Sequence, residues 1–168
     1  MDDAISIEKC RNGDQEAFRH LVERYQRPAV SHAAAILGSR EDALDATQEA
    51  FIDAFRALKG FDSSRAFYPW FYVLLRNRCF KMAARKRETE SIDETVIVAA
   101  SSAAQSEDSL ALEKALRSLD LEDREIITLK YLDGLSYIEL AERLQIPKGT
   151  VMSRLFHARR KLHAKLER

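Results

Sequence analysis

An acidic segment without a single basic residue divides this 168-residue chain into two parts. Residues 88–109 carry six acidic side chains and no Lys or Arg, are rich in Ser and Ala, and lack a helical apolar period. Such a segment buries too little apolar surface to offset the entropy of ordering it. We therefore predict a flexible acidic linker at 88–109, between a first domain at 1–87 and a second at 110–168.

The formal net charge of zero conceals a segregation of charge along the chain. Residues 1–87 hold 15 basic and 12 acidic side chains, and residues 110–168 hold 12 and 9, so each flank has a net charge of +3. The basic residues concentrate at 76–87 and at 145–168. A single basic run is as often a solvated helix face as it is a nucleic-acid contact. Two runs on two modules favour a chain whose two halves face nucleic acid.

Several classes of protein are disfavoured by the composition. Gly and Pro total eight residues, and the apolar residues follow a helical period, which predicts an all-α fold of two small helical domains. The sequence has no apolar run of membrane length and no secretory signal, so we expect no membrane insertion and a cytoplasmic location. Neither a phosphate-cradling loop nor a catalytic or metal constellation is evident. We expect no enzyme, no cofactor and no metal.

The second domain has the pattern of a helix-turn-helix. Ser136-Tyr137-Ile138-Glu139 is a capping box that opens a short helix, and its apolar face is predicted at Ile138, Ala141 and Leu144. Pro147 is suited to the first turn of a last helix, expected at 148–167. Asp120 is the predicted N-cap of the helix that precedes both.

The last helix separates into two faces at about 100° per residue. Val151, Leu155, Ala158 and Leu162 form one narrow apolar stripe, the predicted buried side. Hydroxyls, an imidazole, an aromatic ring and Arg160 lie opposite, which suits a helix that enters a DNA major groove. A solvated amphipathic helix in a bundle is the alternative.

The first domain is predicted to contain three helices. The first runs from about 13 to 37 with a kink or break at Pro28, and the second is capped by Ser39 or Asp42 and runs to about Leu58. The second helix directs acidic and amide side chains outward without an opposing basic stripe: Asp45, Gln48, Glu49 and Asp53. Its apolar residues, Leu44 and Phe55 among them, are expected to pack inward. The acidic face awaits a basic partner or is simply solvated.

The third helix, predicted at 70–87, joins aromatic to basic residues. Five aromatic residues precede the basic run: Phe67, Tyr68, Trp70, Phe71 and Tyr72. Aromatic rings beside basic groups suit binding of unstacked single-stranded bases, whereas the alternative places most of these rings in the core.

Together these segments resemble a known family. The motifs DALDATQEAFIDAFRALKGF, W-x6-N-x7-RKR and GLSYIELAERLQIPKGTVMSRLFHARRKL resemble a bacterial RNA polymerase sigma factor of the extracytoplasmic-function (ECF) group of the sigma-70 family. The resemblance covers about 14–87 and 110–166. It implies a non-enzymatic factor that binds core RNA polymerase, recognises the −35 and −10 promoter elements, melts the −10 region, and is restrained by an anti-sigma factor.

The resemblance also implies a role for each surface. The core-polymerase contact would comprise Asp45, Gln48, Glu49 and Asp53. The −10 contact would comprise Phe61, Arg65, Phe67, Tyr68, Trp70, Asn77, Arg78, Lys81, Arg85, Lys86 and Arg87. The −35 contact would comprise Lys148, Thr150, Met152, Ser153, Arg154, Phe156, His157 and Arg160.

The chain departs from the family at three positions. Gln145 replaces the usual Gly of the turn, so it must take a positive φ or change the turn. Met152 and His157 stand where Lys or Arg is frequent, which leaves the preferred −35 sequence open. Two other functions remain as alternatives: a repressor or activator that binds duplex DNA without polymerase, and an adaptor or anti-factor that binds no DNA.

Overall fold

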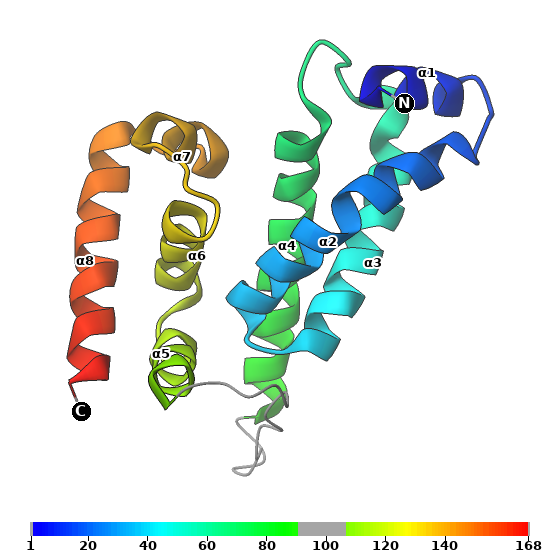
Figure 1. Ribbon diagram of the computed structural model, residues 1–168. Coiled ribbons are helices and arrows are strands. Elements are labelled where there is room, and N and C mark those ends of the chain that lie inside the picture. Colours follow the sequence, from blue (N-terminus) through cyan, green and yellow to red (C-terminus); the bar gives the residue numbers. More distant parts are fainter. Residues whose placement is uncertain (1, 91–106, 168) are drawn as a thin grey trace. The chain divides into compact units, whose positions relative to one another are not determined.

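The computed structural model describes residues 2–90 and 107–167, with their side chains at 2–86 and 110–167. Every regular element within these residues is helical, which confirms the all-α prediction (Figure 1). The helices are α1 (Asp3–Arg11), α2 (Ala17–Leu37), α3 (Arg40–Ala57), the 3-10 turn η1 (Leu58–Gly60), α4 (Phe67–Glu90), α5 (Glu107–Arg117), α6 (Leu121–Tyr131), α7 (Tyr137–Leu144) and α8 (Lys148–Leu166). The chain divides into two compact units, 1–84 and 85–168, and the boundary falls within the last turns of α4.

The predicted linker lies mostly outside the described residues, at 91–106. Its two ends are helical, because α4 continues to Glu90 and α5 begins at Glu107. The bounds of the linker, 88 and 109, stay predictions.

The first unit is built on the α2–α3 hairpin. Gly38 ends α2 in the left-handed conformation at φ 71°, and the Ser39 side chain accepts a hydrogen bond from the Asp42 backbone N–H at 3.2 Å. Ser39 is thus the N-cap of α3, which decides between the two predicted caps. The buried face of α3 is lined by small residues that allow close helix packing: Ala43, Ala46, Ala50 and Ala54. The helix α2 continues through Pro28, so a break there is not observed.

The helix α4 closes this unit with its aromatic first half. Phe71 stacks on Phe51 of α3 with 4.3 Å between ring centroids, and Tyr72 meets His32 of α2 edge-on at 5.3 Å. The helix begins at Phe67, three residues before the predicted start at Trp70. Its third residue is Pro69, which the first helical turn tolerates because the N–H groups there need no intrahelical acceptor.

The second unit contains the predicted helix-turn-helix. Ser136 and Glu139 form both hydrogen bonds of the capping box at the start of α7. Gln145 ends α7 with φ 55° and ψ 41°, so the turn is retained and Gln adopts the left-handed conformation. Leu140 supplies the buried contact of α7, whereas Ile138 is 59% exposed, which corrects the predicted apolar face.

A buried arginine connects α6 to the end of α5. The Arg124 guanidinium donates to the carbonyl oxygens of Leu116 at 3.0 Å, Arg117 at 2.6 Å and Leu119 at 3.0 Å. These carbonyls lie at a helix C-terminus and beyond it, where no intrahelical donor remains. Within the described residues, no helix has the length and apolarity of a membrane span.

Candidate nucleic-acid interface

The helix α8 presents a polar face directly opposite a buried apolar stripe. Val151, Leu155 and Ala158 are at most 1% exposed, and Leu162 is half-buried, as the helical period predicted. On the outer side Met152 is 53% and Phe156 49% exposed. The predicted −35 residues are exposed except Thr150 and Arg154, which are half-buried: Lys148, Thr150, Met152, Ser153, Arg154, Phe156, His157 and Arg160.

Contacts on the outer face of α8 arrange some of these side chains. The Arg160 guanidinium lies 5.8 Å from the centre of the Phe156 ring, and the Phe156 and His157 rings meet edge-on at 5.5 Å. The Ser153 hydroxyl donates to the Thr150 carbonyl at 3.1 Å. Arg154 pairs with Glu122 of α6 at 3.2 Å. An arginine and exposed rings on one rigid face can bond base edges and contact thymine methyl groups.

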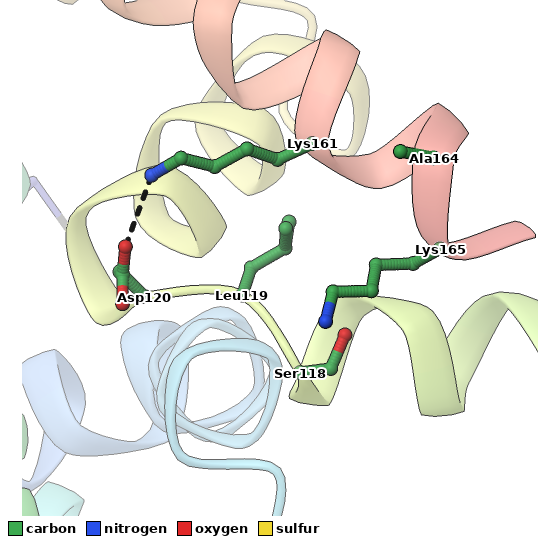
Figure 2. A pocket seen from close by; sticks show the side chains of 6 residues that line it. All are labelled: Ser118, Leu119, Asp120, Lys161, Ala164 and Lys165. Atoms are coloured by element: carbon green, nitrogen blue, oxygen red, sulfur yellow. Dashed lines mark hydrogen bonds and ion pairs between the residues drawn. The ribbon is translucent and has the colours of Figure 1, made fainter.

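Lys161 of α8 also forms ion pairs within its own domain. The Lys161 amine binds the carboxylates of Asp123 and Asp120, the latter at 3.0 Å (Figure 2). These two carboxylates, Asp123 first, raise the pKa of Lys161. Asp120 is the N-cap residue of α6, as predicted, but its carboxylate makes no capping hydrogen bond. The hollow beside this pair is lined by Ser118, Leu119, Asp120, Lys161, Ala164 and Lys165.

The outward face of α3 combines acids with exposed apolar groups. Asp45, Gln48 and Glu49 are exposed, as predicted. Leu44 and Phe55, which were expected to pack inward, are 45% and 39% exposed. Ile52, one turn beyond Gln48, is exposed as well. Leu44, Gln48, Ile52 and Phe55 follow the spacing of one helical stripe, so the face offers apolar contact beside negative charge.

The acidic face is not free of basic partners, contrary to the prediction. Arg78 of α4 donates its Nε to Asp53 at 2.5 Å and its Nη1 to Glu49 at 2.5 Å. Hydrogen bonding from Arg78 is the main cause that lowers the pKa of Asp53. The predicted polymerase contact Asp53 and the predicted −10 contact Arg78 therefore bind each other. Both side chains remain 27% exposed, and their contacts to outside partners stay predictions.

Two of the predicted base-binding aromatic residues lie in the core. Phe61 is 4% and Phe67 2% exposed, and their rings meet edge-on at 6.0 Å. Burial removes both ring faces from any incoming base. Tyr68 and Trp70 are half-buried. The Tyr68 hydroxyl shares a hydrogen bond with His32 Nδ1 at 2.9 Å, and its ring stacks on Tyr25.

The remaining −10 candidates are at the surface of α4 and of the loop before it. Asn77, Lys81, Arg85 and Lys86 are exposed, and so is Arg65 in the loop. The side chain of Arg87 lies outside the described residues. The buried rings thus anchor α4, and the polar side chains named here lie on its exposed surface.

The described residues also contain candidate metal ligands and two thiols outside these surfaces. No three His, Cys, Asp or Glu side chains there are placed to hold a metal ion. Cys79 is buried, and burial is the main cause that raises the pKa of the Cys10 thiol. Neither thiol is placed as an activated nucleophile.

Sequence reasoning missed the exposed apolar side chains of α3 and the whole of α1. The stripe spacing of Leu44 and Ile52 with Gln48 was the available signal for the first. The helix α1 has no strong apolar period in its sequence, so no signal there could have predicted it.

Comparison with known proteins places these surfaces in a family. Residues 21–89 match the family described as Sigma-70 region 2, and residues 109–162 match Sigma-70, region 4. The ECF RNA polymerase sigma-E factor of Escherichia coli (strain K12) is 37% identical over 99% of this chain and 95% of its own length. The ECF sigma factor SigW of Bacillus subtilis (strain 168) is 32% identical, over 95% and 94% respectively.

Two solved structures have the same fold. CnrH in complex with the cytosolic domain of CnrY is 27% identical with a TM-score of 0.69, covering 98% of this chain and 97% of that one. The sigma factor RpoE in complex with the anti-sigma factor NepR, from Bartonella quintana, is 25% identical with a TM-score of 0.71, covering 89% and 96%. With matched segments in both units and relatives that align over nearly its whole length, this chain belongs to the ECF group of sigma-70 family RNA polymerase sigma factors.

Proposed function

We propose that each of the surfaces described above binds a different partner: core polymerase, the −10 element or the −35 element. As an ECF sigma factor, the chain is a non-catalytic subunit of RNA polymerase that initiates transcription, with region 2 binding the −10 element and region 4 the −35 element. The observation that carries the residue assignments is the pair of rigid helix faces: the acidic and apolar face of α3, and the polar face of α8 opposite its buried stripe.

Core polymerase docks on the outward face of α3. Asp45, Gln48 and Glu49 supply negative charge and amide hydrogen bonding, and Leu44 and Ile52 supply apolar area at the centre of the contact. A mixed surface of this kind suits a basic partner element that also carries apolar side chains.

The −10 element is held by α4 and by the loop at 61–66. Asn77 and Lys81 face the open strand, and Arg85 and Lys86 bind its phosphates. Trp70, which is half-buried, offers a partly accessible ring for stacking on a base. The binding energy for the open strand drives melting, so the chain needs no nucleotide hydrolysis.

The −35 element is read by α8 in the major groove. Phe156, His157 and Arg160 approach base edges, with Met152 and Ser153 beside them. Lys148 and the N-terminal turn of α8, whose first N–H groups have no intrahelical acceptor, bind a phosphate.

An anti-sigma factor restrains this sigma factor in the cytoplasm. The two similar structures named above are complexes, one with the anti-sigma factor NepR and one with the cytosolic domain of CnrY. A partner that covers the faces of α3 and α8 would block polymerase docking and −35 reading together. The location is cytoplasmic because the core polymerase that the chain binds acts in the cytoplasm.

Run-off transcription with purified core polymerase over a genomic template library tests the docking assignment. We expect promoter-specific transcripts with the wild type and their loss with Asp45→Lys and with Gln48→Lys, together with reduced association with core polymerase. Glu23→Lys is the matched control, because Glu23 is an exposed acid on α2 that is not part of the proposed contact. If the α3 variants transcribe as well as Glu23→Lys, the docking face has been assigned wrongly.

A further inference from the structure

The helix α1 lies outside both matched family segments, which begin at residue 21 and at residue 109. It is nevertheless firmly attached to the first unit. Ile7 is 2% exposed and Ser6 is completely buried. None of the surfaces assigned above uses α1, so its attachment calls for an explanation of its own.

The two ends of α1 are fixed to different parts of the domain. At its start, the Asp3 carboxylate accepts hydrogen bonds from Arg24, at 3.0 Å, and from the Tyr25 hydroxyl, both on α2. At its end, the Arg11 guanidinium reaches the turn that follows α3. There Nε donates to the Leu58 carbonyl at 3.2 Å, and Nη2 donates to the Phe61 carbonyl.

The two carbonyls held by Arg11 stand at the base of the 61–66 loop. Phe61 is the first loop residue, and its backbone N–H also bonds to the Leu58 carbonyl at 3.2 Å. Its ring is buried 4.7 Å from the Trp70 ring, between centroids. The chain then leaves the core, and residues 62–66 are exposed.

The tip of the loop has a defined shape of its own. The Asp62 carboxylate accepts hydrogen bonds from the Ser64 backbone N–H at 3.0 Å and from the Ser64 hydroxyl at 2.8 Å. The Arg65 backbone N–H bonds to the Asp62 carbonyl at 3.0 Å. The tip is therefore a local turn, and its placement on the domain depends on the residues at its base.

We propose that Arg11 is a positioning residue for −10 recognition: it fixes the base of the 61–66 loop and thereby the place where that loop meets the −10 element. This inference rests on the proposed function of the loop. A guanidinium presents several donors in a rigid fork and so can hold two carbonyls at once, whereas a lysine amine is a point charge on a flexible stem. Because recognition depends on sub-ångström placement, a loop that shifts should lose base preference before it loses binding.

The test uses holoenzyme assembled from core polymerase and the full chain, with forked promoter DNA whose −10 non-template strand is single-stranded. Each −10 position is substituted in turn, and the preference for the best base over the others is measured for the wild type, Arg11→Lys, Arg11→Ala and Asp3→Asn. Asp3→Asn is the matched control, because it loosens the other end of α1 without touching the loop. Binding of the −35 duplex and the midpoint of thermal unfolding are recorded for every variant.

In a well-formed site a wrong base typically costs about 5- to 150-fold in affinity. We expect Arg11→Lys to reduce that preference at one −10 position to within about threefold, with −35 binding unchanged and Asp3→Asn close to the wild type. Lysine retains the charge, so this result separates positioning of the loop from electrostatic attraction. If Arg11→Ala is too unstable to assemble, the lysine variant decides.

Equal base preference in the wild type and Arg11→Lys would overturn the inference, and so would an equal loss of preference in Asp3→Asn. Arg65→Ala, a loop variant, then tells the two proposals apart. If Arg65→Ala changes base preference while Arg11→Lys does not, the loop reads the base without help from α1. If the wild type itself shows no base preference on this DNA, the assignment of the loop to −10 reading fails, and the role of Arg11 fails with it.

Discussion

The guanidinium of Arg78 joins α4 to α3 through Asp53 and Glu49, so its removal is expected to affect stability more than DNA binding. The Arg78 and Asp53 side chains are each 27% exposed. A partly exposed, charge-assisted pair of this kind contributes about 1 kcal/mol to the free energy of unfolding after solvent screening. Urea denaturation at pH 7 should show that loss in Arg78→Ala. Lys81→Ala, an exposed change one turn along α4, should weaken −10 binding without this loss of stability. The reverse pattern would return Arg78 to the DNA surface.

The same pair predicts a pH dependence. The folded-state pKa of Asp53 is lowered, chiefly by the hydrogen bond from Arg78. Its contribution is therefore present above the unfolded pKa of about 3.9 and is lost as pH falls through the folded value. The difference in unfolding free energy between the wild type and Asp53→Asn should shrink below about pH 4. A difference that persists unchanged at pH 2.5 would contradict this account.

Gln145 holds a conformation that most side chains avoid. Its φ of 55° costs about 1 kcal/mol relative to glycine. Gln145→Gly should relieve this strain, although the greater freedom of glycine in the unfolded chain removes part of the gain. We therefore expect a net rise of about 0.5–1 kcal/mol in the unfolding free energy, measured by thermal denaturation. Gly134→Ala is the reciprocal control: the turn before α7 has φ 69° there, and the added methyl group should destabilise. Destabilisation by Gln145→Gly would mean that the side chain has a contact worth more than the strain.

The helix α8 carries two adjacent basic residues with different tasks. Arg160 is on the exposed face beside Phe156, whereas Lys161 binds Asp120 and Asp123 of its own domain. Arg160→Ala should weaken −35 duplex binding by about tenfold, the cost of losing one base or phosphate contact. Lys161→Ala should change it less than about threefold. Fluorescence anisotropy with holoenzyme measures both, and equal effects would show that the faces have been assigned wrongly.

The ends of the helices show where sequence periodicity is informative and where it is not. The stripe of α8 follows from Val151, Leu155 and Ala158, because one face of a helix at a domain surface must be apolar to pack. The start of α4 does not follow, because Pro69 suggests a break although the first turn of a helix accepts proline. The helix α1 lacks an apolar stripe, and long-range contacts from Asp3 and Arg11 hold it in place.

The candidate surfaces have the same division between predictable and unpredictable features. The exposed acids of α3 were predictable from helical spacing, and so was the outer face of α8. The partner of Asp53 was not, because Arg78 lies 25 residues away and only the fold brings the two side chains together. The burial of Phe61 and Phe67 was equally hidden, since an aromatic cluster has the same sequence pattern in a core and on a base-stacking surface.

At the scale of the whole molecule, region 2, which lies mostly in the first unit, binds the −10 element, and region 4 in the second unit binds the −35 element. Lys81 belongs to the first unit and Arg160 to the second. Independent contacts of this kind usually add within about 0.5 kcal/mol. The double variant Lys81→Ala, Arg160→Ala should therefore weaken promoter binding by the product of the two single effects. Its dependence on salt should also be shallower than that of either single variant. A double variant no weaker than the worse single variant would show that only one unit contacts the DNA in the measured complex.

The helix α4 is unbroken, so the exposed residues of the proposed −10 surface keep fixed distances and angles from one another. From Trp70 to Lys81 the helix advances by about 16 Å, since each residue rises about 1.5 Å. A residue inserted between them would lengthen this rod only slightly but would rotate everything beyond it by about 100°. A substitution on the exposed face of α4 leaves the direction of every other side chain unchanged, whereas an insertion or deletion rotates all those beyond it. Exposed residues of α4 can therefore be exchanged in evolution far more readily than a residue can be added or deleted.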